Sequence, residues 1–257
     1  MDEAIAETTV VAGYEGRPQS RDALALARLL GSGWNASVLA LWVPETDEPY
    51  SSTEPARRRV RINAGRELRA SAAELLTGGP DWDFSIQPAS APARGLHDVA
   101  AEQGASAIVV GSSHLGALGR VLVGSTAARL LIEAPCPVAV APRGWADASP
   151  PRPARVGVGL DGCADCEVAL SEAQALAEGL GASLVTLTVA DPKHAADELA
   201  EASQDLDLLV VGCRICSGVA GHPLRSVSRR LIRTSACALI VVPQSVQRGR
   251  AGRSLPS

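Results

Sequence analysis

A glycine-containing loop in the middle of the chain has the residue types needed to bind an anion. Residues 107–110 form a short apolar run, typical of one buried parallel strand, and Gly111 follows directly. After a loop of small residues, Gly124, Ser125 and Thr126 begin an amphipathic helix. Glycines let the backbone approach a phosphate, and free N–H groups at a helix start point towards it. The segment therefore predicts a phosphate-binding strand, loop and helix.

This segment resembles the nucleotide loop of the universal stress protein family, written G-x2-G-x9-G-[ST]. Gly111, Gly124 and Ser125 match the pattern in register, and His114 stands at the position of the second glycine. The strand PCPVAVAP at residues 135–142 follows, as in the family. The alternative is an ordinary strand, loop and helix of an α/β domain. The resemblance covers nearly the whole chain as a tandem arrangement.

The resemblance also implies which residues bind a nucleotide. In the family, the ligand lies across the carboxyl ends of strands one and four, which are neighbours in the strand order 3-2-1-4-5, and doubly wound sheets offer this crevice in general. Glu15 stands where the family usually has an aspartate near the ribose and adenine, and the backbone of Val43 would meet the adenine edge. The loop would be lined by Val110, Gly111, Ser113 and His114, and the phosphates would be held by Gly124, Ser125 and Thr126. The implied ligand is ATP or a related adenine nucleotide.

Two of these residues have an alternative explanation. Glu15 could be a solvated turn residue that touches no ligand. The imidazole of His114 could contact a phosphate and tune ligand choice by protonation, or it could simply face solvent in the loop. Only the position of each side chain separates these alternatives.

Four cysteines in two C-x2-C pairs follow the first and fourth strands of the second half. They are Cys163, Cys166, Cys213 and Cys216. If those strands are neighbours, four sulfurs share one crevice, which would suit zinc or a metal cluster; a redox-labile dithiol is a second possibility. A third is that Cys163 and Cys213 replace small serines of the family while Cys166 packs on a helix. The sequence leaves all three open.

Strands and helices alternate along the chain, which indicates an α/β fold with doubly wound parallel sheets. Residues 8–13 are predicted to form the first strand, and residues 21–30 the first helix. Ser20 is a plausible N-cap of that helix, and Gly31 and Gly33 are expected to end it.

A longer helix is predicted over residues 56–76. Its apolar side chains recur at helical spacing and are Val60, Ala64, Leu68, Ala72 and Leu75. After a Gly-Gly-Pro break, apolar residues alternate at Trp82, Phe84 and Ile86, which indicates a half-exposed strand at the edge of the sheet.

The pattern of the first half recurs in the second half. The first two strands repeat 146 positions later, as from Gly16 to Gly162, and the last two repeat 101 positions later, as from Gly111 to Gly212. The second half therefore lacks 45 residues, which correspond to the long helix and the third strand. Its core is small for an independent unit, so it is expected to lean on the first half as an internal pseudo-dimer.

The repeat defines the expected domains. A complete domain spans residues 1–143, a truncated domain spans residues 154–244, and a Pro- and Ala-rich linker at residues 143–153 joins them. Residues 245–257 are expected to form a tail.

The second half departs from the nucleotide loop of the family. Ile215 and Arg225 place side chains where glycines are expected, although Asp161 keeps the acid of the family. We therefore expect no nucleotide in this half.

Composition limits the possible functions. The chain has 257 residues, 46% of them hydrophobic, and a net charge of −4, which gives no electrostatic argument for nucleic acid. No signal segment and no membrane-spanning apolar run is recognisable, so a cytoplasmic location is expected. Six cysteines should then be reduced, metal-bound or redox-active. Cys136 and Cys237 precede the last strand of each half and are expected to be buried packing residues.

Two functions remain. The first is a tandem binding protein of the stress response, similar to universal stress proteins, whose sensing ligand is ATP or a related adenine nucleotide. Such a protein is expected to form a homo-oligomer or an intrachain pseudo-dimer. The second is a structural or interaction protein with a four-cysteine zinc or redox site. A P-loop and a G-x-S-x-G nucleophile elbow after a strand are both absent from the sequence, so no enzyme is expected.

Overall fold

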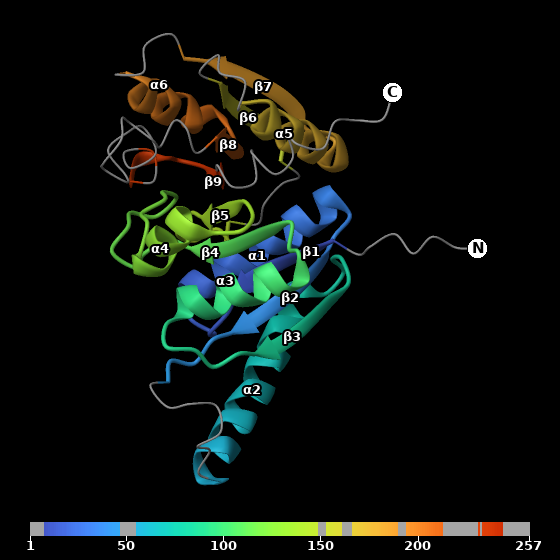
Figure 1. Ribbon diagram of the computed structural model, residues 1–257. Coiled ribbons are helices and arrows are strands. Elements are labelled where there is room, and N and C mark those ends of the chain that lie inside the picture. Colours follow the sequence, from blue (N-terminus) through green and yellow to red (C-terminus); the bar gives the residue numbers. More distant parts are fainter. Residues whose placement is uncertain are drawn as a thin grey trace, which may run out of the picture.

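The computed structural model describes residues 8–46, 55–148, 153–160, 166–189, 194–212, 231 and 233–243. Within these residues, nine strands form one sheet in the order β3-β2-β1-β4-β5-β9-β8-β6-β7 (Figure 1). The strands are β1 (Thr9–Gly13), β2 (Ser37–Trp42), β3 (Trp82–Ile86), β4 (Ala107–Gly111), β5 (Val138–Ala141), β6 (Arg155–Leu160), β7 (Ser183–Thr188), β8 (Leu208–Gly212) and β9 (Ala238–Val242). The helices are α1 (Pro18–Trp34), α2 (Pro55–Leu76), α3 (Pro92–Gln103), α4 (Ser125–Glu133), α5 (Cys166–Leu180) and α6 (Ala195–Ala202), and a 3-10 turn (Ser203–Asp205) follows α6.

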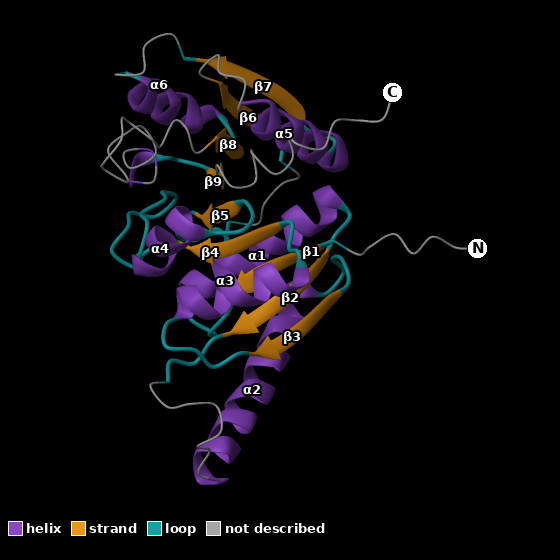
Figure 2. Cartoon of the chain, viewed as in Figure 1, coloured by secondary structure: helices purple, strands orange, loops and turns teal. Residues whose placement is uncertain are grey.

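Each half contains a parallel sheet covered by helices, as Figure 2 shows. The first half has the strand order β3-β2-β1-β4-β5, which confirms the order expected from the resemblance. In the second half β6 lies between β7 and β8, so the first and fourth strands are neighbours in both halves. The residues of β4, β5, β8 and β9 are almost all buried, because their Val-, Ala- and Leu-rich runs face helices or core on both sides. The predicted α/β class with two doubly wound parallel sheets is confirmed.

The two halves join through an antiparallel pair of their last strands, β5 and β9. Ala139 pairs with Ile240, with Val138 opposite Val241 on one side. Ile240 lies 101 positions after Ala139 and is its counterpart in the repeat, so a pseudo-two-fold axis passes between these two residues. The expected internal pseudo-dimer is therefore one continuous sheet.

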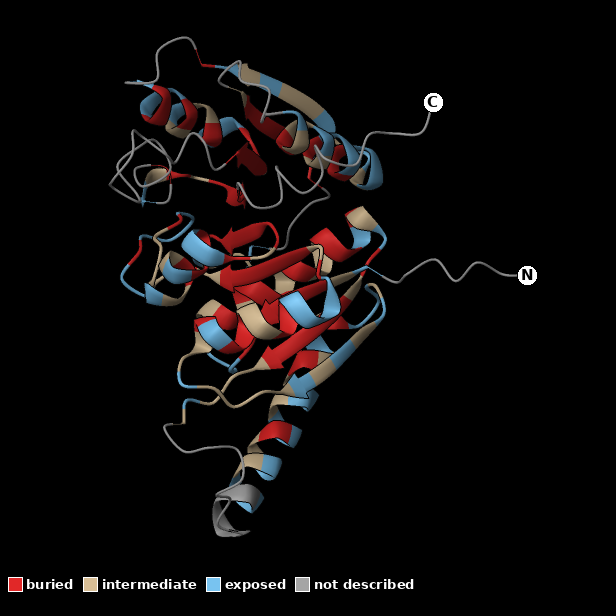
Figure 3. Ribbon diagram, in the orientation of Figure 1, coloured by how far each residue is buried: buried red, intermediate tan, exposed pale blue. Residues whose placement is uncertain are grey.

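Buried residues occur in both halves (Figure 3), and they form two hydrophobic cores that each extend across this joint. One core contains side chains of α3, α4 and α6, and the other contains side chains of α1, α2 and α5. Each core therefore draws residues from both halves. The truncated half, whose own core would be small, buries its apolar side chains against the complete one.

Two glycines bring α1 and α5 into close contact. A Cβ at Gly33 would lie 2.6 Å from Leu176 Cδ1 and 2.9 Å from Leu180 Cγ, and a Cβ at Gly179 would collide with the backbone of Gly33. Gly179 is the repeat counterpart of Gly33, 146 positions later. The prediction that Gly31 and Gly33 end the first helix is wrong. α1 continues to Trp34 and ends at Asn35, which takes the left-handed conformation and donates its N–H to the Gly31 carbonyl.

Ser20 does not cap α1, contrary to the prediction. The helix begins at Pro18, and the N-cap position is Arg17, whose side chain makes no capping hydrogen bond. The Ser20 hydroxyl donates to the Arg17 carbonyl at 2.9 Å and accepts from the Glu15 N–H at 3.1 Å. Ser20 therefore fixes the turn between β1 and α1, because its hydroxyl holds both ends of it.

Only part of the predicted apolar face of α2 is buried. Ala72 is fully buried, and Leu68 and Leu75 are half-buried against the sheet, but Val60 is 70% exposed. Figure 1 shows the reason, since the N-terminal part of α2 projects beyond the sheet. The predicted helix over residues 56–76 is confirmed, and only the C-terminal part of its apolar face is buried. β3 does form the edge strand with alternating exposure that was predicted.

The start of the predicted linker is tied to α1. The carboxylate of Asp22, which is only 3% exposed, accepts hydrogen bonds from the N–H groups of Gly144 and Ala146, both at 2.8 Å. Burial raises the pKa of Asp22 above 3.8, and the two backbone hydrogen bonds oppose that shift. Residues 143–148 are thus an anchored turn.

Of the helices in the described ranges, none is both long and apolar enough to cross a membrane.

Candidate functional site

A crevice opens at the carboxyl ends of β1, β2 and β4, where the resemblance places the nucleotide. Its volume is about 160 Å³. Among the described residues it is lined by Gly13, Tyr14, Glu15, Gln19, Ser20, Leu41, Trp42, Val43, Pro92, Leu96, Val110, Gly111 and Thr126. β1 and β4 are adjacent in the middle of the first half, and the chain leaves them towards opposite faces of the sheet. The crevice therefore lies at the switch point where such sheets bind ligands.

Five of the nine predicted residues line this crevice. They are Glu15, Val43, Val110, Gly111 and Thr126. The other four, Ser113, His114, Gly124 and Ser125, belong to the loop and the helix start beside it. The prediction missed the walls contributed by the first turn of α1, by Trp42 and by α3. The rule that ligands meet carboxyl strand ends could have indicated Trp42, next to Val43, but nothing local in the sequence indicates the α3 residues.

Gly111 is needed for packing as well as for the loop. A Cβ at this position would collide with the backbone of Gln19 in the first turn of α1. Gly111 therefore lets α1 begin directly against the end of β4. This contact brings the α1 side of the crevice close to the glycine loop.

Glu15 lies at the mouth of the crevice and is about half-exposed. Its carboxylate is 3.7 Å from the Arg17 guanidinium, and both side chains reach solvent. An exposed pair at this distance stabilises the fold little. The Glu15 carboxylate is therefore able to exchange this partner for a ligand hydroxyl.

Tyr14 forms a buried wall of the same crevice and was not predicted. Its hydroxyl donates to the Ser71 hydroxyl of α2 at 2.9 Å, and its side chain is only 2% exposed. This hydrogen bond satisfies the polar end of a buried ring. It also fixes the part of α2 that packs on the sheet.

The glycine loop, residues 112–123, is closed by hydrogen bonds within it and to the end of β5. The Ser113 N–H donates to the Leu122 carbonyl at 2.6 Å, and the buried Ser112 hydroxyl donates to the Ala141 carbonyl at 2.7 Å. The Ser113 N–H is therefore committed within the loop.

His114 is exposed, as the solvent-facing alternative requires, and Leu115 and Leu118 are 77% and 78% exposed.

The start of α4 offers backbone donors to an anion. The first helical hydrogen bond runs from the Ala128 N–H to the Gly124 carbonyl at 3.0 Å, which leaves the N–H groups of Ser125 and Thr126 at the helix start. A Cβ built on Gly124 would meet only the Ser113 Cβ, at 3.9 Å, among the described atoms. The space beside the helix start is therefore open to a phosphate.

The second half braces this loop. The Val121 N–H donates to the Ser235 carbonyl at 3.0 Å, and Arg120 Nη1 donates to the Thr234 carbonyl at 2.9 Å. From the linker side, Arg143 Nη1 donates to the Gly116 carbonyl at 2.7 Å. The predicted phosphate loop is thus held from both the linker and the other half.

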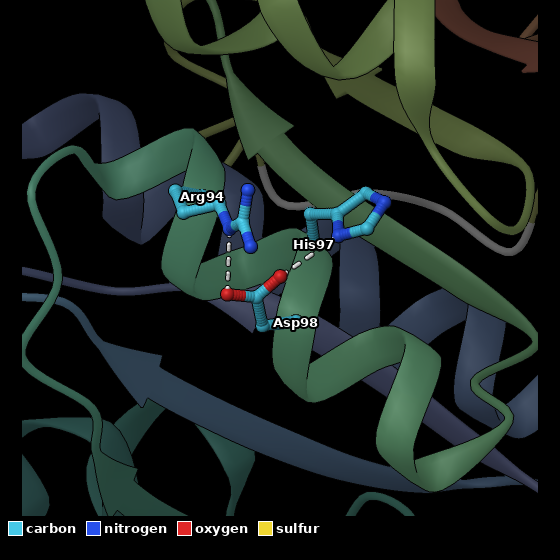
Figure 4. A network of polar contacts seen from close by, with 3 residues as sticks. All are labelled: Arg94, His97 and Asp98. Carbon is cyan, nitrogen blue, oxygen red and sulfur yellow. Dashed lines mark hydrogen bonds and ion pairs between the residues drawn. The ribbon is translucent and has the colours of Figure 1, made fainter.

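A second cavity, of about 600 Å³, lies between α3 and α4 and contains none of the predicted residues. It is lined by Ser90, Ala91, Ala93, Arg94, His97, Arg129, Leu130, Ile132 and Glu133. Beside it, Asp98 accepts a hydrogen bond from Arg94 Nε at 2.8 Å, and His97 Nδ1 lies 3.0 Å from its other oxygen (Figure 4). Burial raises the pKa of Asp98, but the hydrogen bonds from Arg94 and His97 lower it below 3.8 overall. The network neutralises charge on the outer face of α3.

The predicted four-cysteine site lies outside the described residues. Cys163, Cys213 and Cys216 are not described, and α5 begins at Cys166, whose side chain is not described either. The same holds for Asp161 and for the loop of the second half. Among the residues that the structure does describe, no group of side chains is arranged to hold a metal ion.

Cys136 and Cys237 are buried, as predicted. They are 5% and 2% exposed, and burial raises the pKa of both thiols to about 12. Hydrogen bonding to the Ser235 hydroxyl weakly opposes this shift at Cys237. Both side chains therefore act as small apolar groups in the core.

Comparisons with known proteins agree with this architecture. A sequence model described as the universal stress protein family matches residues 8–142. A universal stress protein from Thermus aquaticus is 31% identical over 133 residues, 51% of this chain and 95% of that protein. Universal stress protein Rv2005c from Mycobacterium tuberculosis is 30% identical over 233 residues, 84% of this chain and 76% of that protein. The crystal structure of a universal stress protein from Archaeoglobus fulgidus, at 14% identity, has a TM-score of 0.68 and covers 92% of this chain and 98% of its own.

Proposed function

Because the chain belongs to the universal stress protein family, we propose that its first half binds an adenine nucleotide as a sensing ligand, without chemical turnover. The proposal rests above all on one observation, the continuity of the β1/β4 crevice with the start of α4. Thr126 provides this continuity, since it stands in the first turn of α4 and also lines the crevice. A ligand that is apolar at one end and anionic at the other fits such a site.

Each part of the nucleotide has a matching group. The half-exposed Glu15 carboxylate accepts hydrogen bonds from ribose hydroxyls, and the backbone at Val43 meets the adenine edge. The N–H groups of Ser125 and Thr126 donate to phosphate oxygens, with the helix dipole favouring their charge. No residue in this set is required to act as a nucleophile or a base.

The size of the crevice limits how the ligand is enclosed. At about 160 Å³ it is smaller than the roughly 300–1,000 Å³ of pockets that bury a drug-sized ligand. The nucleoside therefore fills the crevice, and the phosphates extend over the open space beside Gly124. The exposed His114 stands in the loop next to this path.

Titration of the purified full-length chain with labelled ATP tests the proposal. We expect saturable binding that unlabelled AMP and ADP displace. Gly124→Glu should reduce the affinity about tenfold or more, because its carboxylate would lie beside the phosphates and like charges repel.

Gly124→Ala is the matched control, since its Cβ would make only an ordinary contact at 3.9 Å. We expect it to bind ATP as the unchanged chain does. Absence of saturation with millimolar ATP, or equal affinity of the Glu and Ala variants, would contradict the proposal.

A further inference from the structure

The outer edge of β7 is unpaired among the described residues. β7 pairs with β6 and ends the strand order, and in Figure 1 it stands outermost in the second half. Its counterpart in the first half, β2, is covered on the same side by β3. Because the second half lacks counterparts of α2 and β3, β7 carries a row of backbone groups that no described strand satisfies. Such an edge is a template for another strand.

The hydrogen bonds to β6 show which backbone groups point outward. The Ser183 N–H donates to the Ala154 carbonyl at 2.8 Å, and the Val189 N–H donates to the Leu160 carbonyl at 2.9 Å. Donors alternate along a parallel strand, so every second residue from 183 to 189 faces β6. The remaining three, Leu184, Thr186 and Thr188, direct their N–H and C=O groups to the open edge.

The opposite edge of the sheet, β3, is protected against pairing. There the outward N–H of Phe84 is already taken, since it donates to Asp83 Oδ1 at 2.7 Å. The same carboxylate pairs with Arg69 at 3.0 Å, so the edge also carries charge. β7 has the sequence SLVTLT, with no charged residue and no proline. Only one of the two edges therefore has the charged protection that usually prevents association.

We propose that β7 is a homodimer interface, on which β7 of a second copy of this chain pairs antiparallel about a two-fold axis at Thr186. Three outward residues centred on Thr186 make the edge self-complementary. Thr186 faces Thr186 of the second copy, and Leu184 faces Thr188, each pair exchanging two N–H···O=C bonds. Val185 then opposes Leu187 of the second copy, which adds an apolar contact between half-buried side chains.

The same kind of contact already joins the two halves of this chain. In the β5–β9 pair, a strand meets its own repeat counterpart, antiparallel and centred on Ala139 and Ile240. That pair buries its residues between two cores. The β7 pair would repeat this arrangement between copies and extend the sheet across a true two-fold axis.

Sedimentation of the full-length chain over a range of concentrations tests the interface. We expect a dimer that dissociates on dilution. Thr186→Pro removes the central outward N–H without touching a bond to β6, and Thr186→Lys places two ammonium groups face to face. Proline removes the central pair of hydrogen bonds, and lysine adds repulsion between like charges. Either change should therefore raise the dimer dissociation constant about tenfold or more.

Two controls separate the interface from a general effect. Thr186→Val keeps the N–H and the branched side chain, and Ser85→Lys places the same charge on the exposed face of β3; both variants should remain dimers. In the dimer, the amides of Leu184, Thr186 and Thr188 should exchange slowly, and in the Thr186→Lys monomer they should exchange fast. A monomer at all concentrations, or a dimer that both Thr186 variants leave unchanged, would overturn the proposal.

Discussion

The Val121 N–H donates a hydrogen bond to the Ser235 carbonyl at 3.0 Å, so the second half of the chain holds the glycine loop of the first. Arg120 adds a second link 2.9 Å long, to the carbonyl of Thr234. The second half, whose own sequence departs from the glycine loop pattern, thus contacts the glycine loop of the first half.

Removal of the Arg120 link should loosen the loop. Arg120→Ala deletes one hydrogen bond from a charged donor at an exposed position, which contributes about 1 kcal/mol. We expect ATP affinity to fall severalfold and exchange of the loop amides to become faster. Arg129→Ala, on the exposed side of α4, should change neither quantity. Equal behaviour of the two variants in ATP titration would show that the brace does not shape the site.

Glu15 should contribute directly to nucleotide affinity. Glu15→Ala removes the acceptor at the mouth of the crevice and should weaken ATP binding about fivefold to tenfold, which corresponds to one hydrogen bond of about 1 kcal/mol. Glu102→Ala, an exposed substitution near the end of α3, provides the control in the same titration. If both variants bind ATP equally well, Glu15 is the solvated turn residue of the alternative explanation.

Gly179→Ala should destabilise the fold, although alanine is the better helix former. Propensity alone would add about 1 kcal/mol of stability in a helix interior. Here the new Cβ would collide with the Gly33 backbone, and overpacking of this kind costs about 1–3 kcal/mol. We expect a lower free energy of unfolding in urea, whereas Ser32→Ala, exposed on α1, should have no such effect. An increase in stability for Gly179→Ala would refute the close crossing.

Asp22→Asn should release the start of the linker from α1. An amide has one acceptor oxygen for two N–H groups, so one of the bonds from Gly144 and Ala146 is lost, at about 1–3 kcal/mol for a buried donor. Because folding raises the pKa of Asp22, its contribution is fully present below 3.8 and declines as pH rises through the raised pKa. The difference in unfolding free energy between the two chains should therefore shrink from acidic to neutral pH. A difference that grows over this range would contradict the assigned shift.

Cys136 and Cys237 should resist alkylation in the folded chain. With a pKa of about 12, only about one thiol in 10⁵ is ionised at neutral pH, and both are buried. Mass spectrometry after iodoacetamide treatment should find both unmodified in the native chain and modified in denaturant. Their contribution to stability is present below 9.0 and is lost as pH rises towards 12, because folding disfavours the thiolate. Native labelling of either residue would show that the core opens there.

The sequence by itself determined the order of strands and helices, the parallel sheets and the repeat, because buried strands and amphipathic helices leave periodic patterns. The resemblance to the family assigned Glu15, Val43 and Gly111 to one crevice, and the structure places all three there, at the carboxyl ends of parallel strands. Only the tertiary structure showed that Gly33 permits α5 to pack closely against α1. A glycine that ends a helix and a glycine that admits another helix look the same locally, and only the approach of Gly179 distinguishes them.

The joint between the halves was likewise decided only in three dimensions. The offsets of 146 and 101 residues identify the counterparts Gly33 and Gly179, and Ala139 and Ile240, but they do not say that counterparts touch. That depends on a pseudo-two-fold axis, which pairs β5 with β9 and brings α1 against α5. Contacts between residues more than a hundred positions apart leave no periodic signal in the chain, because the shapes of two assembled surfaces decide them.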